Sequence, residues 1–401
     1  MAKKSGVSAS RVKKTVKAVN KVSRSKAGLI FLAIVLVLAV GTLLALYFTG
    51  NLKLPGFIPN PNESKDSQTE TVHEVVAYDS EDLIITFLEL GNWFTGDCTF
   101  IKAGDTDILI DAGSRLNSVP SITEVINKYC TDGKLEYVIV THAHQDHIAG
   151  FAPGSESSKG IFDYYECGLI IDYAQSNSTA KVRENYEKAR DKEVESGATH
   201  MTAAQVRESG HYVFDLSEGI TMTILDSKFY YDHSSNENNY SVCCLINQGG
   251  DRNFLFTGDL EEDGEKYLVE RNSLPKVNLF KGGHHGSYTA SSETLLEVIQ
   301  PEIVCICCCA FSNEYTDVEA NMFPAQSTID RIANYTDRVY VTTVSTDNST
   351  KAFESLNGTI TVTSKKGEEI TVSCSGLNVP LKDTPWFKEK REMPDKWKTA
   401  A

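Results

Sequence analysis

The pattern of apolar and polar residues divides the chain into three regions. An apolar segment near the start is followed by a polar stretch and then by a long region of short apolar runs. Residues 27–48 contain no charged side chain. At about 1.5 Å per residue, a helix of this length crosses a hydrocarbon core of roughly 30 Å, so we expect a transmembrane helix here. A cleaved signal peptide is the alternative, but the apolar region of such peptides is only about 7–15 residues long.

The rest of the pattern predicts a linker and one mixed domain. Residues 49–80 are rich in proline and then polar without an apolar period, which is typical of an extended linker. Apolar runs predict strands at 83–90, 98–103, 106–113, 134–141, 220–227, 240–247, 253–259 and 301–311. Two further runs, 358–364 and 368–374, flank a KKG turn and predict a hairpin, and helical spacing predicts helices over 119–129 and 179–196. We expect one α/β domain over 81–377 and a charged tail at 378–401, to which we assign no role.

Charge is distributed unevenly along this chain. Its 41% hydrophobic and 23% charged residues are ordinary for a folded protein. Residues 1–26 hold nine basic residues and no acid, so the net charge of −15 leaves −24 on the remainder. Positive charge before an apolar helix favours a cytoplasmic N-terminus. We therefore expect a single-pass protein of the cytoplasmic membrane, anchored through residues 27–48, with the basic segment inside and the domain outside.

Histidines supply the first chemical signal. The string THAHQDHIAG follows a predicted strand and contains His142, His144, Asp146 and His147. Residues i and i+2 of an extended segment point to one side, so His142 and His144 can bind one metal ion while Asp146 and His147 turn toward a second. Two cations about 3.5–4 Å apart can share a hydroxide that hydrolyses phosphate esters or amides. Two zinc ions are expected, although manganese or iron accepts such ligands, and a histidine-rich surface loop is the alternative.

Three further strings follow apolar runs and are expected at strand ends. They are LIDAG, LFTGD and GGHHGS, which contain Asp111, Asp259, His284, His285 and Ser287. Singly they are weak signals, because an aspartate at a strand end usually caps a turn or a helix. In this order, the strings resemble the metallo-β-lactamase superfamily. They are most similar to its branch containing the hydrolase domain of the ComEC competence proteins and the phosphorylcholine esterases, from about Leu83 to Cys374.

The resemblance implies a four-layer αββα sandwich and a role for each motif residue. His142 and His144 would bind the first metal, Asp146 and His147 the second, Asp259 would bridge them, one of His284 and His285 would complete the second site, and Asp111 would hold the ligand loop. Asp146 would also orient the metal-bound hydroxide, and Ser287 would donate a hydrogen bond to a substrate phosphate. Tyr288, Ser291 and Ser292 are further candidates for substrate contact, or else cap the next helix.

One departure from the superfamily pattern concerns the first metal. Many members supply a further histidine shortly before the strand that precedes the bridging aspartate, where this chain has Asn238 and Asn239. His233 lies a few residues too early, although a loop could bring it in. The ComEC-like branch resembles this chain in having asparagine there. The first site is therefore expected to be weaker, or completed by water or substrate.

Ten cysteines complicate the expected location. Cys305, Cys307, Cys308 and Cys309 fall in one predicted buried strand, and Cys243 and Cys244 in another. Their spacing is not that of a zinc finger, and cysteine packs well in a core. Cysteines outside the membrane also invite disulfides, so both interpretations stay open. His73, His200 and His211 have no neighbouring candidate ligands and are expected to be structural or exposed.

These features predict a membrane-anchored metallohydrolase that acts on a phosphodiester. Nucleic acid and a phosphate-bearing envelope polymer are the two substrate candidates. The absence of a basic run in 80–377 disfavours broad DNA affinity, which relies on lysine and arginine patches, whereas the ComEC resemblance favours DNA. A carbonyl hydrolase (lactonase, β-lactamase or thioesterase) and an inactive metal-binding scaffold are the alternatives.

Overall fold

A computed structural model describes residues 79–155 and 157–398. The predicted basic segment, transmembrane helix and nearly all of the linker lie outside these residues. Within the described part, no helix combines the length and apolar character needed to cross a bilayer.

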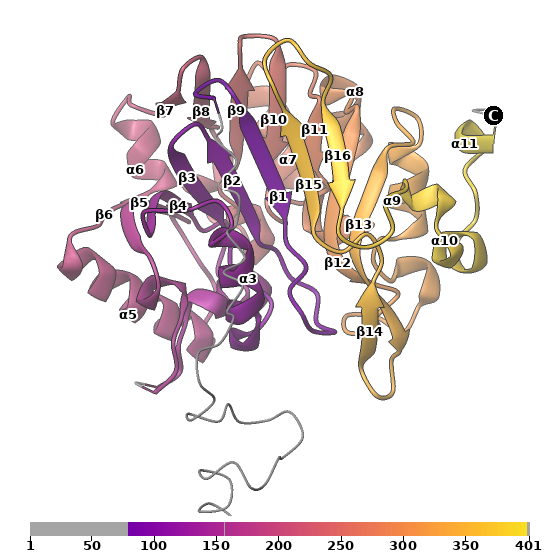
Figure 1. Ribbon diagram of the computed structural model, residues 1–401, viewed down its shortest axis with the longest axis horizontal. Helices are drawn as coiled ribbons and strands as arrows, with labels where there is room; N and C mark the ends of the chain where they lie inside the picture. The colour runs from indigo at the N-terminus through magenta and orange to yellow at the C-terminus, as the bar shows by residue number, and fades with distance from the viewer. Residues whose placement is uncertain (1–78, 156, 399–401) are drawn as a thin grey trace, which may run out of the picture. The chain divides into compact units, whose positions relative to one another are not determined.

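Two eight-stranded sheets form the centre of the domain (Figure 1). The first contains, in spatial order, β16 (Thr371–Cys374), β15 (Ile360–Ser364), β1 (Leu83–Phe87), β2 (Thr99–Ala103), β3 (Thr106–Ile110), β4 (Lys134–Ile139), β5 (Glu166–Asp172) and β6 (Thr199–Thr202). The second contains β14 (Ala352–Ser355), β13 (Val339–Asp347), β12 (Ile303–Ala310), β11 (Leu279–Lys281), β10 (Arg252–Phe256), β9 (Cys244–Gln248), β8 (Ile220–Ile224) and β7 (Val213–Ser217). The predicted hairpin is confirmed as the antiparallel pair β15–β16.

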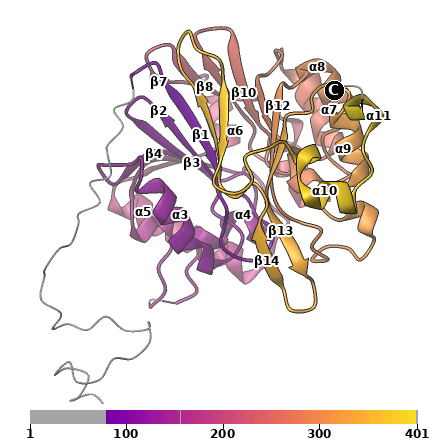
Figure 2. The same cartoon turned by 45° about the vertical axis from the view of Figure 1, so that its right-hand side comes forward.

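Helices cover the outer face of each sheet (Figure 2). On the first sheet these are α3 (Val119–Ile126), α4 (Gln145–Ile148) and α5 (Lys181–Ser196), with α6 (Ala203–Glu208) near its edge. On the second sheet they are α7 (Glu262–Arg271), α8 (Glu293–Ile299), α9 (Gln326–Ile332), α10 (Pro385–Lys390) and α11 (Asp395–Lys398). Helices and sheets therefore stack in four layers.

Three apolar clusters hold the layers together. The central cluster joins the facing sides of the sheets, with the rings of Phe87 and Phe256 stacked 6.4 Å apart between their centroids. A second cluster packs α3 and α5 on the first sheet through residues such as Ile122 and Tyr186. The third packs the helices of the opposite side on the second sheet. The expected α/β architecture, an αββα sandwich, is confirmed.

The cysteines are core residues. All ten lie in the described part of the chain, and none forms a disulfide there. Cys305 and Cys307 belong to the central cluster and Cys308 to the outer one, because alternate residues of β12 face opposite sides. Burial raises the pKa of the Cys305 and Cys308 thiols well above the usual value, which keeps them protonated and unreactive.

The charged tail takes part in the outer core. Leu381, Phe387 and Trp397 are 0%, 0% and 5% exposed, and all three belong to the cluster on the second sheet. Arg391 donates to the Met322 carbonyl at 2.8 Å and so ties the tail to the loop before α9. Apolar side chains spaced through the charged tail are thus buried on one face of α10 and α11.

Replacement of Phe387 tests this packing. Phe387→Ala is expected to lower the free energy of unfolding by about 3–5 kcal/mol, because it leaves a cavity in a closed core. Leu377→Ala is the control, since Leu377 is 43% exposed and stands just before the tail. Urea unfolding followed by circular dichroism measures both variants. Equal stability of the two variants would contradict the contribution of Phe387 to the outer core.

Candidate metal centre

The predicted ligands come from four strand ends. Asp111 follows β3, residues 142–147 follow its parallel neighbour β4, Asp259 follows β10, and residues 284–285 follow the parallel strand β11. Parallel strands end at the same edge of a sheet, so each sheet brings two of these loops together. The packing of the two sheets then joins the pairs.

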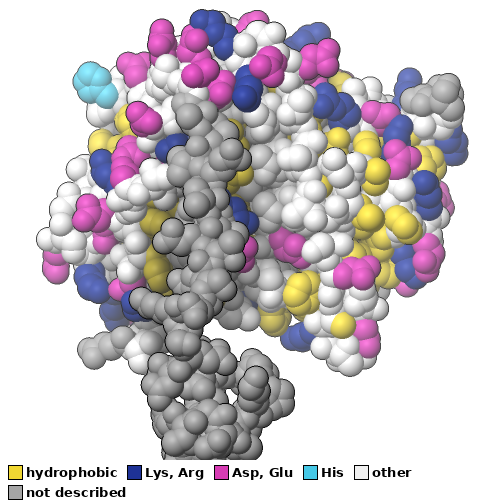
Figure 3. All heavy atoms as spheres, viewed as in Figure 1, with side chains coloured by type: hydrophobic (Ala, Val, Ile, Leu, Met, Phe, Trp, Pro, Cys, Tyr) yellow, Lys and Arg dark blue, Asp and Glu magenta, His cyan; other side chains and the backbone are white. Residues whose placement is uncertain are grey.

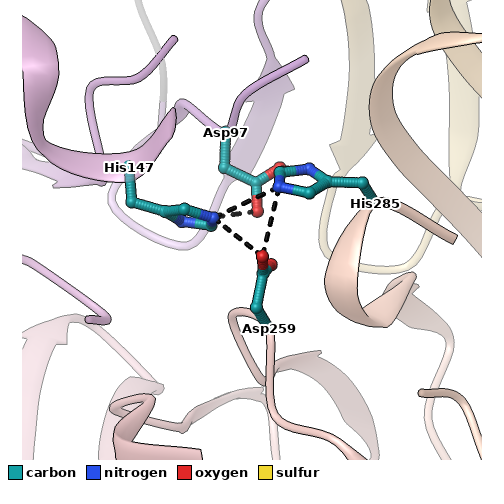
Figure 4. Close-up of side chains that lie close together, drawn as sticks. All are labelled: Asp97, His147, Asp259 and His285. Atoms are coloured by element: carbon teal, nitrogen blue, oxygen red, sulfur yellow. Dashed lines mark hydrogen bonds and ion pairs between the residues drawn. The ribbon is translucent and has the colours of Figure 1, made fainter. Parts of the chain in front are cut away.

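The centre of the cluster is the Oδ2 atom of Asp259 (Figure 4). It lies 3.0 Å from His147 Nε2 and 3.1 Å from His285 Nε2. The Nε2 atoms of His142 and His284 each lie 3.9 Å from the same oxygen. Asp259 is only 1% exposed. Four imidazole nitrogens therefore converge on one buried carboxylate oxygen.

His144 and Asp146 extend the cluster by contacts with different histidines. His144 Nδ1 lies 3.0 Å from His142 Nε2, and Asp146 Oδ2 lies 3.4 Å from His285 Nε2. All seven predicted metal ligands thus form one contiguous group. Their assignment to particular ions stays a prediction.

A hydrogen-bond acceptor holds the outer nitrogen of three of these imidazoles. Nδ1 lies 2.7 Å from Asp111 Oδ2 in His147, 2.8 Å from the Cys307 carbonyl oxygen in His285 and 3.2 Å from Glu261 Oε1 in His284. An acceptor at Nδ1 holds one ring proton there, so Nε2, which faces Asp259, is the nitrogen that would bind a metal after losing its own proton. Metal-binding histidines in proteins have this arrangement.

Asp111 lies behind the ligands. Its Oδ1 accepts the Thr141 backbone N–H at 2.8 Å, and its Oδ2 accepts the Thr141 hydroxyl at 2.7 Å as well as facing His147. The carboxylate is 1% exposed and its backbone has φ 59°. Asp111 therefore fixes both the start of the histidine loop and the orientation of His147.

The two adjacent histidines adopt an unusual backbone. His284 has φ 45° and His285 has φ 54°, in the left-handed region that costs a non-glycine residue about 1–2 kcal/mol. Gly286 follows with φ 81°, and a Cβ there would lie 2.7 Å from Pro324 Cβ. This tight turn is what allows both imidazoles to face Asp259.

Close packing of loops fixes the histidine string. Asp97 N donates to the Asp146 carbonyl at 3.0 Å, and Gly113 N donates to the Asp97 carbonyl at 2.9 Å. A Cβ on Gly113 would lie only 1.4 Å from the Asp146 carbonyl oxygen, so no other residue fits. The loops after β3 and β4 and the loop before β2 are therefore interlocked around the site.

Sequence reasoning missed Asp97 and Lys281. Asp97 lies within 4.8 Å, ligand atom to ligand atom, of His147, Asp259 and His285 (Figure 4). Lys281 is 3% exposed, forms an ion pair with Asp97 and lies 3.7 Å from Asp259 Oδ1. Their available signals were weak, namely a GD dipeptide before β2 and a lysine that two glycines separate from the HH pair.

Tyr315 was also missed and has no sequence signal. It comes from the loop between β12 and α9, and its hydroxyl donates to Asp146 Oδ2 at 2.6 Å. Its ring packs on Phe323, which in turn lies 5.8 Å from the rings of both His284 and His285. Because Tyr315 is 51% exposed, it forms part of the rim of the site.

The asparagine at the expected histidine position does lie beside the site. Asn238 is 5% exposed, and its Nδ2 lies 3.5 Å from His284 Nε2 and donates to Glu261 Oε1 at 2.8 Å. His233 instead pairs through Nδ1 with the Tyr240 hydroxyl at 3.2 Å and is exposed. No contact joins His233 to the predicted ligands among the described residues.

The remaining candidates separate into two groups. Ser287 Oγ lies 2.9 Å from Thr289 Oγ1, which lies 3.1 Å from His284 Nδ1, so Ser287 reaches the histidines through Thr289. Ser292 caps α8 by accepting the Leu295 N–H, and this agrees with the capping alternative. Ser291 Oγ accepts the Gly283 N–H, and Tyr288 is exposed.

The charges at the site are strongly coupled. Burial opposes ionisation of Asp259, but His147, His285 and His284 hold its pKa well below the usual range. Burial likewise opposes protonation of His147, but Asp259 and Asp111 raise its pKa to about 10. Burial and the neighbouring His147 and His144 lower the pKa of His142, which keeps that ring neutral.

These residues fit a metal centre. Imidazole nitrogen and carboxylate oxygen are the ligands of catalytic zinc and of related divalent metals. Asp259 Oδ1 and both oxygens of Asp97 are buried without a hydrogen bond among the described residues, and Lys281 is the cation that faces both carboxylates. His142, His144, Asp146, His147, Asp259, His284 and His285 would hold the ions, which would supply Lewis acidity and an activated water.

Comparisons with known proteins agree with the resemblance. The profile of the Metallo-beta-lactamase superfamily matches residues 91–158. ComE operon protein 3 of Bacillus subtilis is 24% identical over 178 residues, which are 43% of this chain and 20% of that protein. Recombination protein 2 of Haemophilus influenzae is 24% identical over 253 residues, or 62% of this chain and 27% of that protein. The chain thus spans about a fifth to a quarter of these relatives.

Among solved structures, the metallo-beta-lactamase fold protein YhfI from Bacillus subtilis is similar, with 12% identity and a TM-score of 0.39. That similarity covers 65% of this chain and 96% of that one. The family match and the two relatives confirm the resemblance to the metallo-β-lactamase superfamily and its ComEC-type branch.

The pKa of His147 gives a testable pH dependence. Because the folded-state pKa of about 10 exceeds the ordinary value of 6.5, the protonated ring stabilises the metal-free fold below about pH 6.5. That contribution is lost as the pH rises toward 10. Urea unfolding of the metal-stripped protein is therefore expected to show a free energy of unfolding that falls between these pH values.

Proton release on metal binding tests the protonation of His147. A metal ligand must lose its proton, so zinc binding at pH 7 is expected to release protons. Calorimetry in two buffers of different ionisation enthalpy measures that release, and His147→Gln is expected to reduce it by about one proton. Binding without proton release would contradict the assignment of charge at this site.

Proposed function

Starting from a metallo-β-lactamase-like hydrolase domain of the ComEC type, we propose that this protein is a membrane-anchored, metal-dependent phosphodiesterase. The observation that carries the proposal is the convergence of four imidazole Nε2 atoms on Asp259 Oδ2. A buried carboxylate with four imidazole nitrogens around it offers the donor atoms that divalent metal ions bind. The resemblance to the branch that contains ComEC hydrolase domains and phosphorylcholine esterases, with which these two relatives agree, favours a phosphodiester over other hydrolysable bonds.

The protein side chains would orient the reacting atoms and offset charge at the site. Bound metal ions would supply the attacking hydroxide and stabilise charge on the phosphate. Asp146, held by the Tyr315 hydroxyl at 2.6 Å, would orient the attacking oxygen. Lys281 would offset part of the negative charge of Asp97 and Asp259 beneath the site. The Ser287–Thr289 pair is placed to support His284, and a direct bond from Ser287 to substrate stays part of the proposal.

A recess beside His284 bears on the choice of substrate. It has a volume of about 640 Å³ and is lined by Asn236, Glu261, Glu262, Asp263, Tyr288 and Thr289 among others. Three carboxylates on its wall would repel a long polyanion. On the face shown in Figure 3, acidic and basic side chains of the described residues are interspersed rather than gathered into a basic surface. These features favour an envelope phosphodiester, or a small one, over extended nucleic acid.

The location of the enzyme is part of the proposal. The uncharged residues 27–48 and the basic residues before them support a single-pass anchor with the domain outside the cytoplasmic membrane. The ten unpaired cysteines are compatible with that location because nine of them are buried. Burial protects those thiols from oxidants as well as from each other.

Hydrolysis of bis(p-nitrophenyl) phosphate tests the activity. The full chain, kept in mild detergent because of residues 27–48, is expected to release nitrophenolate when zinc or manganese is present. His142→Ala is expected to reduce this rate at least about 100-fold, since loss even of groups that only support a metal ligand costs 10–100-fold. His211→Ala, a change of the same kind at an exposed histidine, serves as the matched control.

Other outcomes would redirect the assignment. Turnover that survives in His142→Ala at the wild-type rate would contradict the proposed site. Turnover of lactone or thioester substrates without turnover of the phosphodiester would favour a carbonyl hydrolase, which would use the same metal ligands. Two bound ions without turnover of any of these substrates would favour a metal-binding scaffold.

A further inference from the structure

The two adjacent histidines of the HH pair share Asp259 but differ in the other groups that their Nε2 atoms face. His285 Nε2 lies 3.3 Å from His147 Nε2 and 3.4 Å from Asp146 Oδ2. His284 Nε2 instead lies 3.5 Å from Asn238 Nδ2. Asn238 is one of the two asparagines, with Asn239, at the place where the resemblance predicts a histidine for the first metal. The free nitrogen of His284 thus points to the side of the site where the sequence lacks a ligand.

Distances to the shared carboxylate agree with this division. His284 Nε2 and His142 Nε2 are both 3.9 Å from Asp259 Oδ2, whereas the nitrogens of His147 and His285 are at 3.0 and 3.1 Å. His285 therefore groups with His147, the histidine expected at the second ion, since the two Nε2 atoms also lie 3.3 Å apart. His142 and His284 lie farther from the oxygen, outside that pair.

Glu261 fixes His284 in this orientation. Its Oε1 lies 3.2 Å from His284 Nδ1, which also has the Thr289 hydroxyl at 3.1 Å. The same Oε1 accepts Asn238 Nδ2 at 2.8 Å, and Oε2 accepts Asn236 Nδ2 at 2.8 Å. Glu261 also precedes α7, and its own N–H donates to Asn239 Oδ1 at 3.3 Å. A carboxylate bound on both oxygens by asparagine amides is a rigid acceptor. A rigid acceptor at Nδ1 makes the opposite nitrogen a better metal ligand.

Partial exposure and backbone strain at His284 argue against a merely structural contact between Glu261 and His284. His284 has a side chain that is 19% exposed, and its backbone is held in the left-handed region, at φ 45°. A surface ion pair contributes little stability and would not repay that strain. Strain of this kind is retained where the position of a side chain matters for function.

We propose that His284 and His285 serve different metal positions: His284, held by Glu261, supplies to the first ion the imidazole that the chain lacks at position 238, and His285 completes the second. This inference rests on the metal centre of the proposed function. Asn238 is then a part of the support for His284, because its amide holds Glu261 in place. The first site has a full set of protein ligands rather than a deficient one.

Metal stoichiometry and affinity test the proposal without any assay of turnover. The full chain in detergent is dialysed against buffered zinc, and bound zinc is counted by mass spectrometry of the metal. Wild type and the control His211→Ala are expected to retain two ions per chain. His284→Ala is expected to retain one tightly bound ion and to bind the other at least about 100-fold more weakly, because a direct ligand matters more than its support.

Paired substitutions assign the ion that is lost. If His284 and His142 share an ion, the double variant His142→Ala/His284→Ala still retains one ion. His284→Ala/His285→Ala is expected to retain none. The opposite pattern, with His284 and His285 losing the same ion, would overturn the proposal.

Glu261→Gln tests the support without removing a ligand. The amide keeps the shape of the side chain but weakens the acceptor at His284 Nδ1, so the affinity for one ion is expected to fall about 10–100-fold. An unchanged affinity in this variant would overturn the role of Glu261. Two ions bound with unchanged affinity in His284→Ala would overturn the role of His284, while leaving the proposed function intact. A wild-type chain that binds no ion would remove both proposals together.

Discussion

The organising interaction of this domain is the burial of the Asp259 carboxylate among imidazoles. A carboxylate that is 1% exposed is costly unless cations or hydrogen-bond donors surround it. Here His147, His285, His142 and His284 surround Oδ2, and Lys281 lies near Oδ1. Four loops at strand ends bring these groups to one oxygen. The same arrangement provides the imidazole nitrogens that a metal centre requires.

The fold supplies the rigidity that such a centre needs. Loops after β3 and β4 and the loop before β2 share backbone hydrogen bonds, and Gly113 packs directly on the Asp146 carbonyl. Acceptors at Nδ1, namely Asp111, Glu261 and the Cys307 carbonyl, fix three rings from behind. Backbone strain at positions 284 and 285 is the local cost of directing two successive side chains inward. Packing on both outer faces of the sandwich stabilises these positions.

Most strands and the loops that form the site could be predicted from the sequence, because short local patterns of residues indicate them. Apolar runs predicted most strands of the two sheets, and the histidine and aspartate strings at their ends predicted which loops would meet. Strands β5, β6, β7, β11, β13 and β14 were not predicted. β11 has only three residues, too few for a periodic signal, and the burial of a strand edge depends on neighbours distant in sequence.

The missed site residues depend on tertiary contacts. Asp97, Glu261, Lys281 and Tyr315 become functional only because other segments fold against them, and single polar residues carry no pattern that reveals this. The sequence also left open which of His284 and His285 binds metal, because both belong to one short turn. Only the geometry around Asp259 and Asn238 separates them. The packing of the charged tail was not predicted either, because its buried residues are widely spaced along the sequence.

A crystal structure of the zinc-loaded protein, with diffraction recorded across the zinc absorption edge, tests the central claim most directly. The account predicts two anomalous peaks about 3.5–4 Å apart on either side of Asp259 Oδ2. One peak would be contacted by His142 and His144, and the other by His147 and His285. Zinc peaks that lie away from Asp259, or no peak at this cluster in zinc-saturated crystals, would contradict it.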